Sequence, residues 1–380
     1  MTFIHQEKTW PDFQWDMEIL DPLLTEVKQK LNFLFTQLAT FPPALQDKAE
    51  LESLTKEVLA TSSFEGEHFC QEEVRSALAK RLKIDIGEIM PASPIVEGYT
   101  QLLLDAVKNS ASPLNAERLF AWHSFINPSG QLGMRTILSG AWRSAVIGMK
   151  QVITGHFRHE RLSYEPPMPT QLSGNMKALI EWINLPSSGP CASNAIPNKQ
   201  GLDPILEAGI GYLWLVAIHP FDSHNGLFGQ TLADYVLARN NNEPRHFYSI
   251  SAPVQRNRKT YYNALESSLR GGINITPWLV DFLHTVQKAI KTSLESFNYI
   301  LHKAKTWENA SLYPVNQRQK KVLHYLLDYS LPGITTMKYA KIAKCSPDTA
   351  LRDIRELNEF GITKRSLAGG RSTSYELIVL

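Results

Sequence analysis

One short stretch combines residue types that could carry out phosphate chemistry, HPFDSHNG at residues 219–226. It follows an apolar run at 211–218 and precedes a helical pattern at 231–239. A histidine at a helix end can act as a general base near neutral pH, and the free amides that open a helix attract anions. The stretch therefore predicts an anion site beside a base. A buried core histidine is the alternative that this motif alone leaves open.

Three amphipathic helices are expected ahead of this motif. Apolar residues at three- and four-residue spacing predict a helix over 23–38, and the sequence Phe41-Pro42-Pro43 ends it because proline lacks an amide hydrogen. Further helices are expected over 45–60 and 71–82. Pro91 and Pro94 mark the end of this N-terminal helical region.

The middle of the chain, residues 102–305, also shows a mainly helical pattern. A stretch rich in β-branched and aromatic residues at 152–164 predicts a short hairpin. Residues 186–200 are rich in Pro, Ser, Asn and Gly, which predicts a loop.

The C-terminal segment has the element order of a winged helix-turn-helix. Helices are expected over 316–328, 339–343 and 346–360, followed by a hairpin over 362–380. Residues 316–380 contain eleven Lys and Arg against six Asp and Glu, although the whole chain has a net charge of only +2. Such a basic module could neutralise DNA phosphates and place its third helix against base edges.

The predicted DNA contacts lie on that third helix and on the wing. They are Ser346, Asp348, Thr349, Arg352 and Arg355 on the helix, and Lys364, Arg365 and Arg371 on the wing. Asp348, Asp353 and Glu356 place acidic groups on the same helix. A protein-binding module with a solvated basic face is therefore the alternative.

The composition is that of a globular protein with two or three domains. Of 380 residues, 43% are hydrophobic and 20% charged. Three scattered cysteines predict neither a disulfide framework nor a zinc cluster, and we expect no metal-ligating set. The first residues do not resemble a secretory signal, and the apolar run at 210–220 is too short to span a membrane. These features predict a cytoplasmic protein that does not contact membranes.

Residues 219–230, HPFDSHNGLFGQ, resemble the signature HPFx[D/E]GNGRxxR of the Fic (Fido-fold) family. Residues 61–66, TSSFEG, resemble the inhibitory helix motif of that family, and the segment 140–167 resembles the flap that docks target proteins. The resemblance implies a mainly α fold: a Fido-fold helical core with a short β-hairpin flap, plus a C-terminal winged helix-turn-helix. The implied domains are an N-terminal helical region at 1–95, a Fido core at 96–310 and the winged helix at 311–380.

The family mostly transfers AMP from ATP to a protein hydroxyl, so the resemblance implies ATP, Mg²⁺ and a protein target at the flap. It assigns His219 as the general base, and Asn225 and Gly226 as phosphate ligands. The inhibitory motif is represented by Thr61, Glu65 and Gly66. A homodimer is one assembly compatible with the sequence.

Four positions depart from the family pattern. Ser223 replaces the carboxylate that holds Mg²⁺, and His224 replaces a glycine of the anion site. Leu227 and Gln230 replace two arginines that contact phosphates. Losing one preorganised donor at a developing charge costs about 2.7–4 kcal/mol. We therefore predict weak or absent AMP transfer, as in a pseudoenzyme, and a doubtful Mg²⁺ site. An active transferase with altered donor specificity, or with phosphate contacts supplied elsewhere, is the alternative.

For several other polar residues the sequence favours a structural or surface role. Asp222 and His224 could ligate a metal only with a further ligand, so a solvent-facing histidine is favoured. Glu65 faces the neutral Gln230, which favours a structural role at a helix end. His156 and His159 are expected on the surface of the flap. The sequence leaves two roles open for Arg258, Tyr261 and Tyr262, contact with a nucleotide and packing in the core.

Overall fold

The computed structural model describes residues 2–132, 135–144, 164–186, 199–240, 245–328, 333–366 and 373–378. The chain forms two compact units, Met1–Leu294 and Glu295–Leu380, and the boundary falls inside helix α11. The predicted boundaries at 95/96 and 310/311 stay predictions. The predicted hairpin over 152–164, most of the loop over 186–200 and the tip of the C-terminal hairpin lie outside the described residues.

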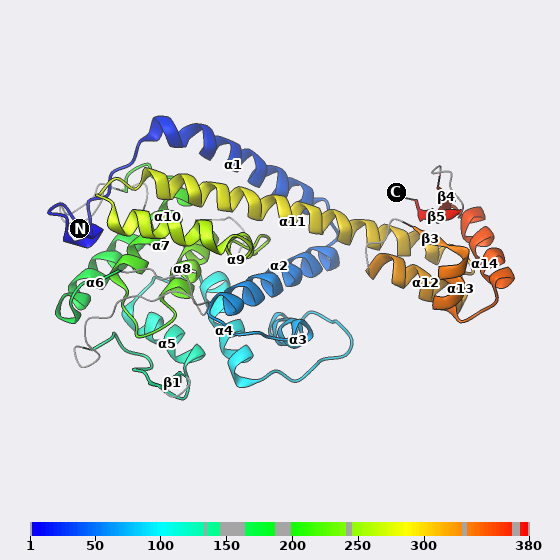
Figure 1. Ribbon diagram of the computed structural model, residues 1–380, viewed down its shortest axis with the longest axis horizontal. Helices are drawn as coiled ribbons and strands as arrows, with labels where there is room; N and C mark the ends of the chain where they lie inside the picture. The colour runs from blue at the N-terminus through cyan, green and yellow to red at the C-terminus, as the bar shows by residue number, and fades with distance from the viewer. Residues whose placement is uncertain are drawn as a thin grey trace. The chain divides into compact units, whose positions relative to one another are not determined.

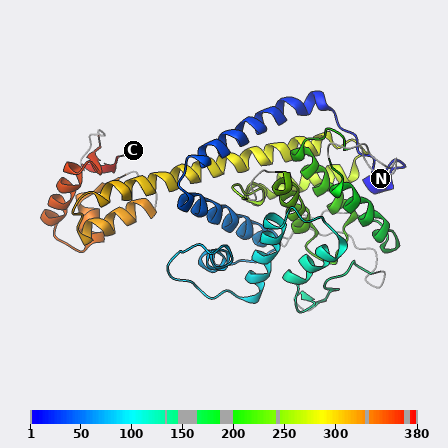
Figure 2. The ribbon, with the colours of Figure 1, turned by 180° about the vertical axis from the view of Figure 1, so that it is seen from behind.

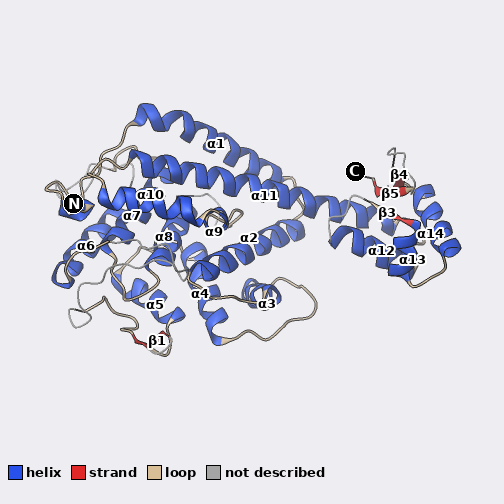
Figure 3. Ribbon diagram, viewed as in Figure 1, coloured by secondary structure: helices blue, strands red, loops and turns tan. Residues whose placement is uncertain are grey.

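The expectation of a mainly helical protein is confirmed (Figures 1 and 3). The elements of the first unit are η1 (Ile4–Gln6), α1 (Met17–Ala39), α2 (Pro43–Phe64), α3 (Gln71–Leu82), α4 (Pro94–Lys108), α5 (Ala116–Ile126), β1 (Gln131–Leu132), β2 (Arg135–Thr136), α6 (Pro169–Asn184), α7 (Pro204–Ile218), α8 (Asn225–Asn240), α9 (Ser251–Arg256), α10 (Arg258–Arg270) and the first part of α11 (Thr276–Ser311). None of the helices in the described part of the chain is long and apolar enough to cross a membrane.

Local sequence signals explain the first three helices. The Asp16 carboxylate accepts a hydrogen bond from the Glu18 amide at 2.9 Å and so caps the start of α1. Pro43 occupies the first position of α2, where its missing N–H costs nothing. Lys83 ends α3 in the left-handed conformation. Helix α1 runs alongside the first part of α11 in both views (Figures 1 and 2).

Helices α7 and α8 form the centre of this unit. Every residue of α7 from Ile205 to Ile218 is buried, so this helix needs neighbours on all sides. The two helices approach closely at Gly229, where a Cβ atom would lie 2.5 Å from the ring of Tyr212. Only glycine fits at this crossing without displacing the ring.

A buried ion-pair group ties α6, α7 and α8 together. Glu207 of α7 is fully buried, and its Oε1 lies 2.7 Å from Lys199 Nζ and 2.6 Å from the Arg239 guanidinium. Lys199 Nζ also donates to the backbone oxygens of Ile183 and Leu185 at the end of α6. These contacts satisfy helix-end carbonyls that would otherwise be buried without partners.

The second unit comprises three helices and a small sheet after the end of α11. Its elements are α12 (Gln317–Asp328), β3 (Ile334–Thr335), α13 (Thr336–Ala343), α14 (Pro347–Glu359), β4 (Thr363–Arg365) and β5 (Ser374–Leu377). The strands are antiparallel in the order β3-β5-β4. The three helices match the sequence expectation closely, whereas strand β3 and the β1–β2 pair have no counterpart in it.

Replacing Gly229 by alanine should destabilise the protein by about 1–3 kcal/mol, because the added methyl group must displace the Tyr212 ring. The matched control is Gly174→Ala on α6, where nothing lies within 4 Å of the added Cβ. That control should be neutral or stabilising by up to about 1 kcal/mol. Urea unfolding of both variants tests this, and equal stabilities would contradict the close packing of α7 on α8.

Candidate functional site

The loop between α7 and α8 contains two histidines with a left-handed backbone. His219 (φ 51°, ψ 59°) ends α7 and donates its N–H to the Leu215 carbonyl at 2.9 Å. His224 (φ 61°) directly precedes α8. Such a conformation costs free energy in a residue other than glycine, and it persists where the surroundings impose it. At His224 the family pattern has glycine, which adopts this conformation without strain.

Asn225 closes this loop on itself. Its Oδ1 accepts from the Phe221 amide and its Nδ2 donates to the Phe221 carbonyl, both at 2.9 Å. Asn225 is 3% exposed and Phe221 is fully buried. The predicted phosphate ligand Asn225 is therefore engaged by the loop's own backbone, while Gly226 forms part of the first turn of α8.

A buried arginine that the sequence analysis missed holds the same loop from outside. Arg143 Nε donates to the His219 carbonyl at 2.7 Å, and another guanidinium nitrogen donates to the Pro167 carbonyl. The Arg143 amide donates to the Pro220 carbonyl at 2.8 Å. Burial lowers the pKa of Arg143, and the nearby charge of Asp222 opposes that effect. These three bonds fix the backbone that carries the predicted base.

Two histidines at this loop, His123 from α5 and His224 of the loop itself, are uncharged at neutral pH. His123 is fully buried, and its ring stacks on Phe221 with centroids 4.6 Å apart. Burial lowers the pKa of His123 to about 4, aided by His224, and burial also lowers the pKa of His224 to about 4. His224 Nδ1 lies 2.8 Å from the Ser223 hydroxyl. At pH 7 neither ring supplies the positive charge that a phosphate would need.

The two positions that the family pattern fills with arginine lie inside the protein. Leu227 and Gln230 are each 1% exposed. Gln230 Oε1 lies 2.8 Å from the Ser251 hydroxyl, which can donate to it. Both side chains have become part of the packing around α8.

The residues present do not fit Mg²⁺ and ATP as the family binds them. Ser223 offers a hydroxyl in place of a carboxylate, and Asp222 next to it is 4% exposed and accepts from the Leu138 amide at 3.1 Å. Across the described ranges, no group of three metal-type ligands includes Asp222, His224 or His219. The loop therefore keeps the predicted base without the predicted metal ligand.

The inhibitory-type motif lies at the end of α2. The Thr61 hydroxyl donates to the Glu57 carbonyl of its own helix, and Glu65 ends the helix with its amide bonded to the Ser62 carbonyl at 3.1 Å. Gly66 follows with φ 92°. Glu65 Oε1 lies 3.8 Å from the point that a Cβ of Gly226 would occupy. Glu65 thus ends a helix and also places its carboxylate against the first turn of α8.

Helix α10 holds this end of α2 in place. Arg258 donates to the Ser63 carbonyl, which is one of the last carbonyls of α2. The rings of Tyr261 and Tyr262 pack on Phe64 with centroids 5.4 and 5.3 Å away. These three side chains of α10 thus pack against the end of α2 that carries the inhibitory-type motif. The flap residues His156 and His159 lie outside the described residues.

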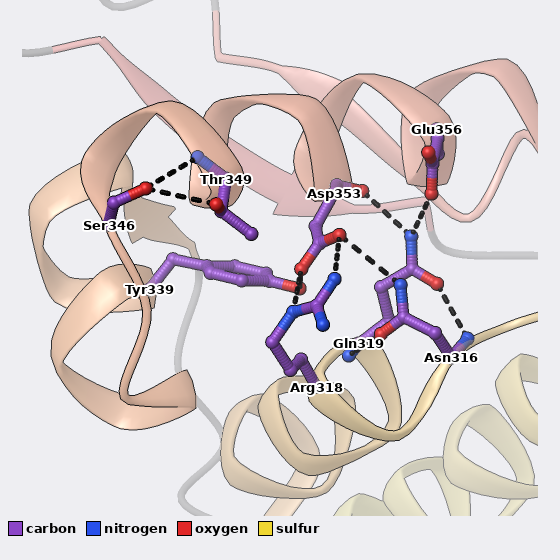
Figure 4. A network of polar contacts seen from close by, with 8 residues as sticks. All are labelled: Asn316, Arg318, Gln319, Tyr339, Ser346, Thr349, Asp353 and Glu356. Atoms are coloured by element: carbon purple, nitrogen blue, oxygen red, sulfur yellow. Dashed lines mark hydrogen bonds and ion pairs between the residues drawn. The ribbon is translucent and has the colours of Figure 1, made fainter.

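The predicted DNA-binding helix, α14, exposes its two arginines and buries one of its acidic side chains. Arg352 and Arg355 are exposed, whereas Asp353 is 1% exposed. The Ser346 hydroxyl caps the helix by accepting from the Thr349 amide at 3.2 Å, as the sequence predicts (Figure 4). Lys364 and Arg365 are exposed on β4, and Arg371 lies outside the described residues.

Asp353 and Glu356 of α14 contact α12, and Asp353 also contacts α13 (Figure 4). Asp353 accepts two hydrogen bonds from Arg318, at 2.8 and 2.9 Å, and one from Tyr339 at 3.2 Å. Burial raises the pKa of Asp353, but the hydrogen bonds from Arg318 and Asn316 outweigh it and lower the pKa overall. Glu356 accepts from Gln319 at 2.9 Å. Of the three predicted acidic residues, Asp348 is exposed, Asp353 is buried and Glu356 is half-buried.

Comparisons with known proteins match two parts of the chain to families. Residues 113–237 match the Fic/DOC family, and residues 3–84 match a domain of unknown function (DUF4172). Over 285 residues the chain is 23% identical to the protein adenylyltransferase fic-1 of Caenorhabditis briggsae, and over 284 residues it is 24% identical to that of Caenorhabditis elegans. Each match covers 73% of this chain and 48% of the relative, so the chain spans about half their length.

Solved structures share the fold. A Fic family protein from Desulfovibrio desulfuricans has a TM-score of 0.53 at 13% identity, covering 97% of this chain and 98% of that one. Residues 134–508 of Fic-1 from C. elegans give a TM-score of 0.50 at 16% identity, covering 73% and 72%. The mainly helical Fido-type architecture is thus common to all three.

Replacing Arg143 by lysine should destabilise the first unit by about 1–3 kcal/mol, because one ammonium group cannot reach both carbonyls and leaves a buried acceptor unpaired. The matched control is Arg256→Lys, because Arg256 is exposed. Urea unfolding of both variants measures the effect. Equal stabilities would show that Arg143 does not hold the loop.

Proposed function

We propose that this chain, which belongs to the Fic/DOC family through residues 113–237, is a DNA-binding regulatory protein in which the Fic loop no longer supports efficient AMP transfer. The observation that carries the proposed loss of AMP transfer is the burial of Leu227 and Gln230. Where the family pattern supplies two cations for phosphates, this chain supplies one apolar and one neutral side chain.

Phosphoryl and nucleotidyl transfer depend mainly on positioning the phosphates and neutralising their charge. Removing one such donor costs about 10²–10³ in rate, while a general base supplies only about 10²–10⁴. His219 alone therefore cannot restore the rate lost at Ser223, Leu227 and Gln230. The neutral His224 ring adds no compensating charge.

The position of Glu65 supports the same proposal. Its carboxylate lies against Gly226, where the family binds phosphate. Two negative groups repel each other there, and the favourable field of the free amides at the start of α8 already acts on Glu65. In this chain Glu65 stabilises the junction of α2 with α8.

An active transferase with a different donor is the second candidate. It is favoured by the base that the loop retains, because Arg143 holds the backbone of His219 in a defined conformation. A base kept in place can deprotonate a hydroxyl if another group holds the leaving group.

Incubation with ³²P-labelled ATP and Mg²⁺ should label the protein no more than a His219→Ala variant does. A Glu65→Gly variant should remain equally unlabelled, because the loop still lacks cations after the carboxylate is removed. Autoradiography of all three proteins measures this. Labelling that depends on His219, with or without Glu65, would overturn the proposed loss of AMP transfer, and a parallel screen of other nucleoside triphosphates tests the second candidate.

The DNA-binding half of the proposal rests on α14 and the strands that follow it. Three helices followed by β4 and β5 have the element order of a winged helix-turn-helix. Asp353 is buried and binds Arg318, and Glu356 accepts from the buried Gln319. Both carboxylates are therefore engaged within the unit rather than directed at a phosphate backbone at Arg352 and Arg355. This weakens the case for a protein-binding module, which then rests on the exposed Asp348.

Fluorescence anisotropy with a random 30-base-pair duplex should show binding that weakens steeply as salt is raised. Arg355→Ala should weaken binding and reduce the slope of log K against log salt by about 1 for a phosphate contact. Lys177→Ala is the charge-matched control, since the Lys177 side chain is 76% exposed and lies on α6 of the first unit. No binding at low salt, or equal effects of both substitutions, would contradict the DNA role.

A further inference from the structure

Three ionisable side chains from distant parts of the chain meet inside the first unit. They are Glu57 of α2, Asp234 of α8 and His246, and they are 1%, 2% and 6% exposed. One ligand atom from each lies within 4.8 Å of the others. None of the three residues belongs to the loop at residues 219–224 or to α14.

The cluster buries two carboxyl groups close to each other, and burial disfavours their charged forms. Burial raises the pKa of Asp234 well above its usual value, and the charge of Glu57 adds to that effect. Burial also raises the pKa of Glu57, against hydrogen bonds from Ser249 and Ser251. Within the part of the chain that the structure describes, Asp234 Oδ1 and His246 Nε2 have no hydrogen-bond partner although they are buried. Buried polar atoms rarely remain unpaired without a water or an ion nearby.

We propose that Glu57, Asp234 and His246 form a binding site for one divalent transition-metal ion, with Zn²⁺ as the best match. One imidazole and two carboxylates are a ligand set that Zn²⁺ accepts, and a water can complete four-coordination. Two carboxylates and a divalent cation sum to zero charge, which removes the cost of burying the two anions. Mg²⁺ fits less well because it prefers oxygen ligands and retains several waters.

The surrounding groups fit the role of a second shell. The Ser249 hydroxyl donates to Glu57 Oε2 at 2.6 Å and the Ser251 amide donates to the same oxygen at 3.2 Å. Such bonds orient a ligating carboxylate. Tetrahedral ligands about 2.1 Å from zinc lie roughly 3.4 Å apart, whereas the three ligand atoms here lie within 4.8 Å of one another, so they need to close by at most about 1.4 Å on binding.

Zinc competes with protons for the three ligand side chains. Burial lowers the pKa of His246 to about 3, and Lys108 lowers it further, so this ring is already neutral and ready to ligate. The carboxyl groups of Asp234 and Glu57 ligate only when deprotonated, so any proton that they hold leaves to solvent as the ion binds. The charged and titratable groups around the site are Glu57, Lys108 paired with Glu50, and Tyr248. Zinc affinity should therefore fall as the pH falls.

The test uses the full chain without an affinity tag, stripped with dipicolinate and then given Zn²⁺. We expect one equivalent of zinc to remain after desalting, measured by mass spectrometry. The Tm should rise by roughly 5 °C at a zinc concentration about a hundred times Kd. Asp234→Asn and His246→Gln should abolish both effects. Either variant suffices if the other does not fold, as judged by circular dichroism.

His68→Gln is the matched control, because His68 is exposed and lies close to the exposed Cys70 in the sequence. This control should keep the zinc and the rise in Tm. Three results would overturn the proposal: a stripped protein that binds no zinc, binding that survives in both cluster variants, or binding that is lost in the His68 variant. In the first case the carboxylates of Glu57 and Asp234 instead share a proton.

Discussion

The fold of the first unit depends on burying a helix that is apolar on every side. Helix α7 leaves no face for solvent, so α6, α8 and α11 must surround it, and the chain must reverse direction directly after it. That reversal is made by a short loop with left-handed histidines at both ends, closed by Asn225 and held by Arg143. The position of His219 follows from this packing requirement and would persist whether or not the loop carries out a reaction.

The helices were predictable because their signals are local. The predicted range 71–82 coincides with α3, and the Ser346-Pro347 pair correctly predicts the capped start of α14. These signals act within a few residues, where periodicity and capping dominate the free energy. The family resemblance likewise rested on short stretches of consecutive residues, 219–230 first and then 61–66 and 140–167, and the match of residues 113–237 to the Fic/DOC family agrees with it.

Contacts between distant residues could not be predicted in the same way. Arg143 lies 76 positions from the carbonyl that it binds, and Glu57 lies far along the chain from Asp234 and His246. No local pattern marks any of these residues. Asp353 of α14 shows the same limit. In the sequence its negative charge argues against a DNA-binding face, but in the structure it is buried against Arg318 and Tyr339 and does not lie on that face. Helical spacing alone could not tell which side of α14 would be covered.

The burial of Leu227 and Gln230 has a consequence for the history of the motif. An arginine introduced at either position would enter surroundings that are 1% exposed, and an unpaired buried charge costs several kcal/mol. A single substitution back to the family pattern would therefore reduce stability before it restored any contact with phosphate. An arginine at either position would therefore also require changes in the side chains that surround it.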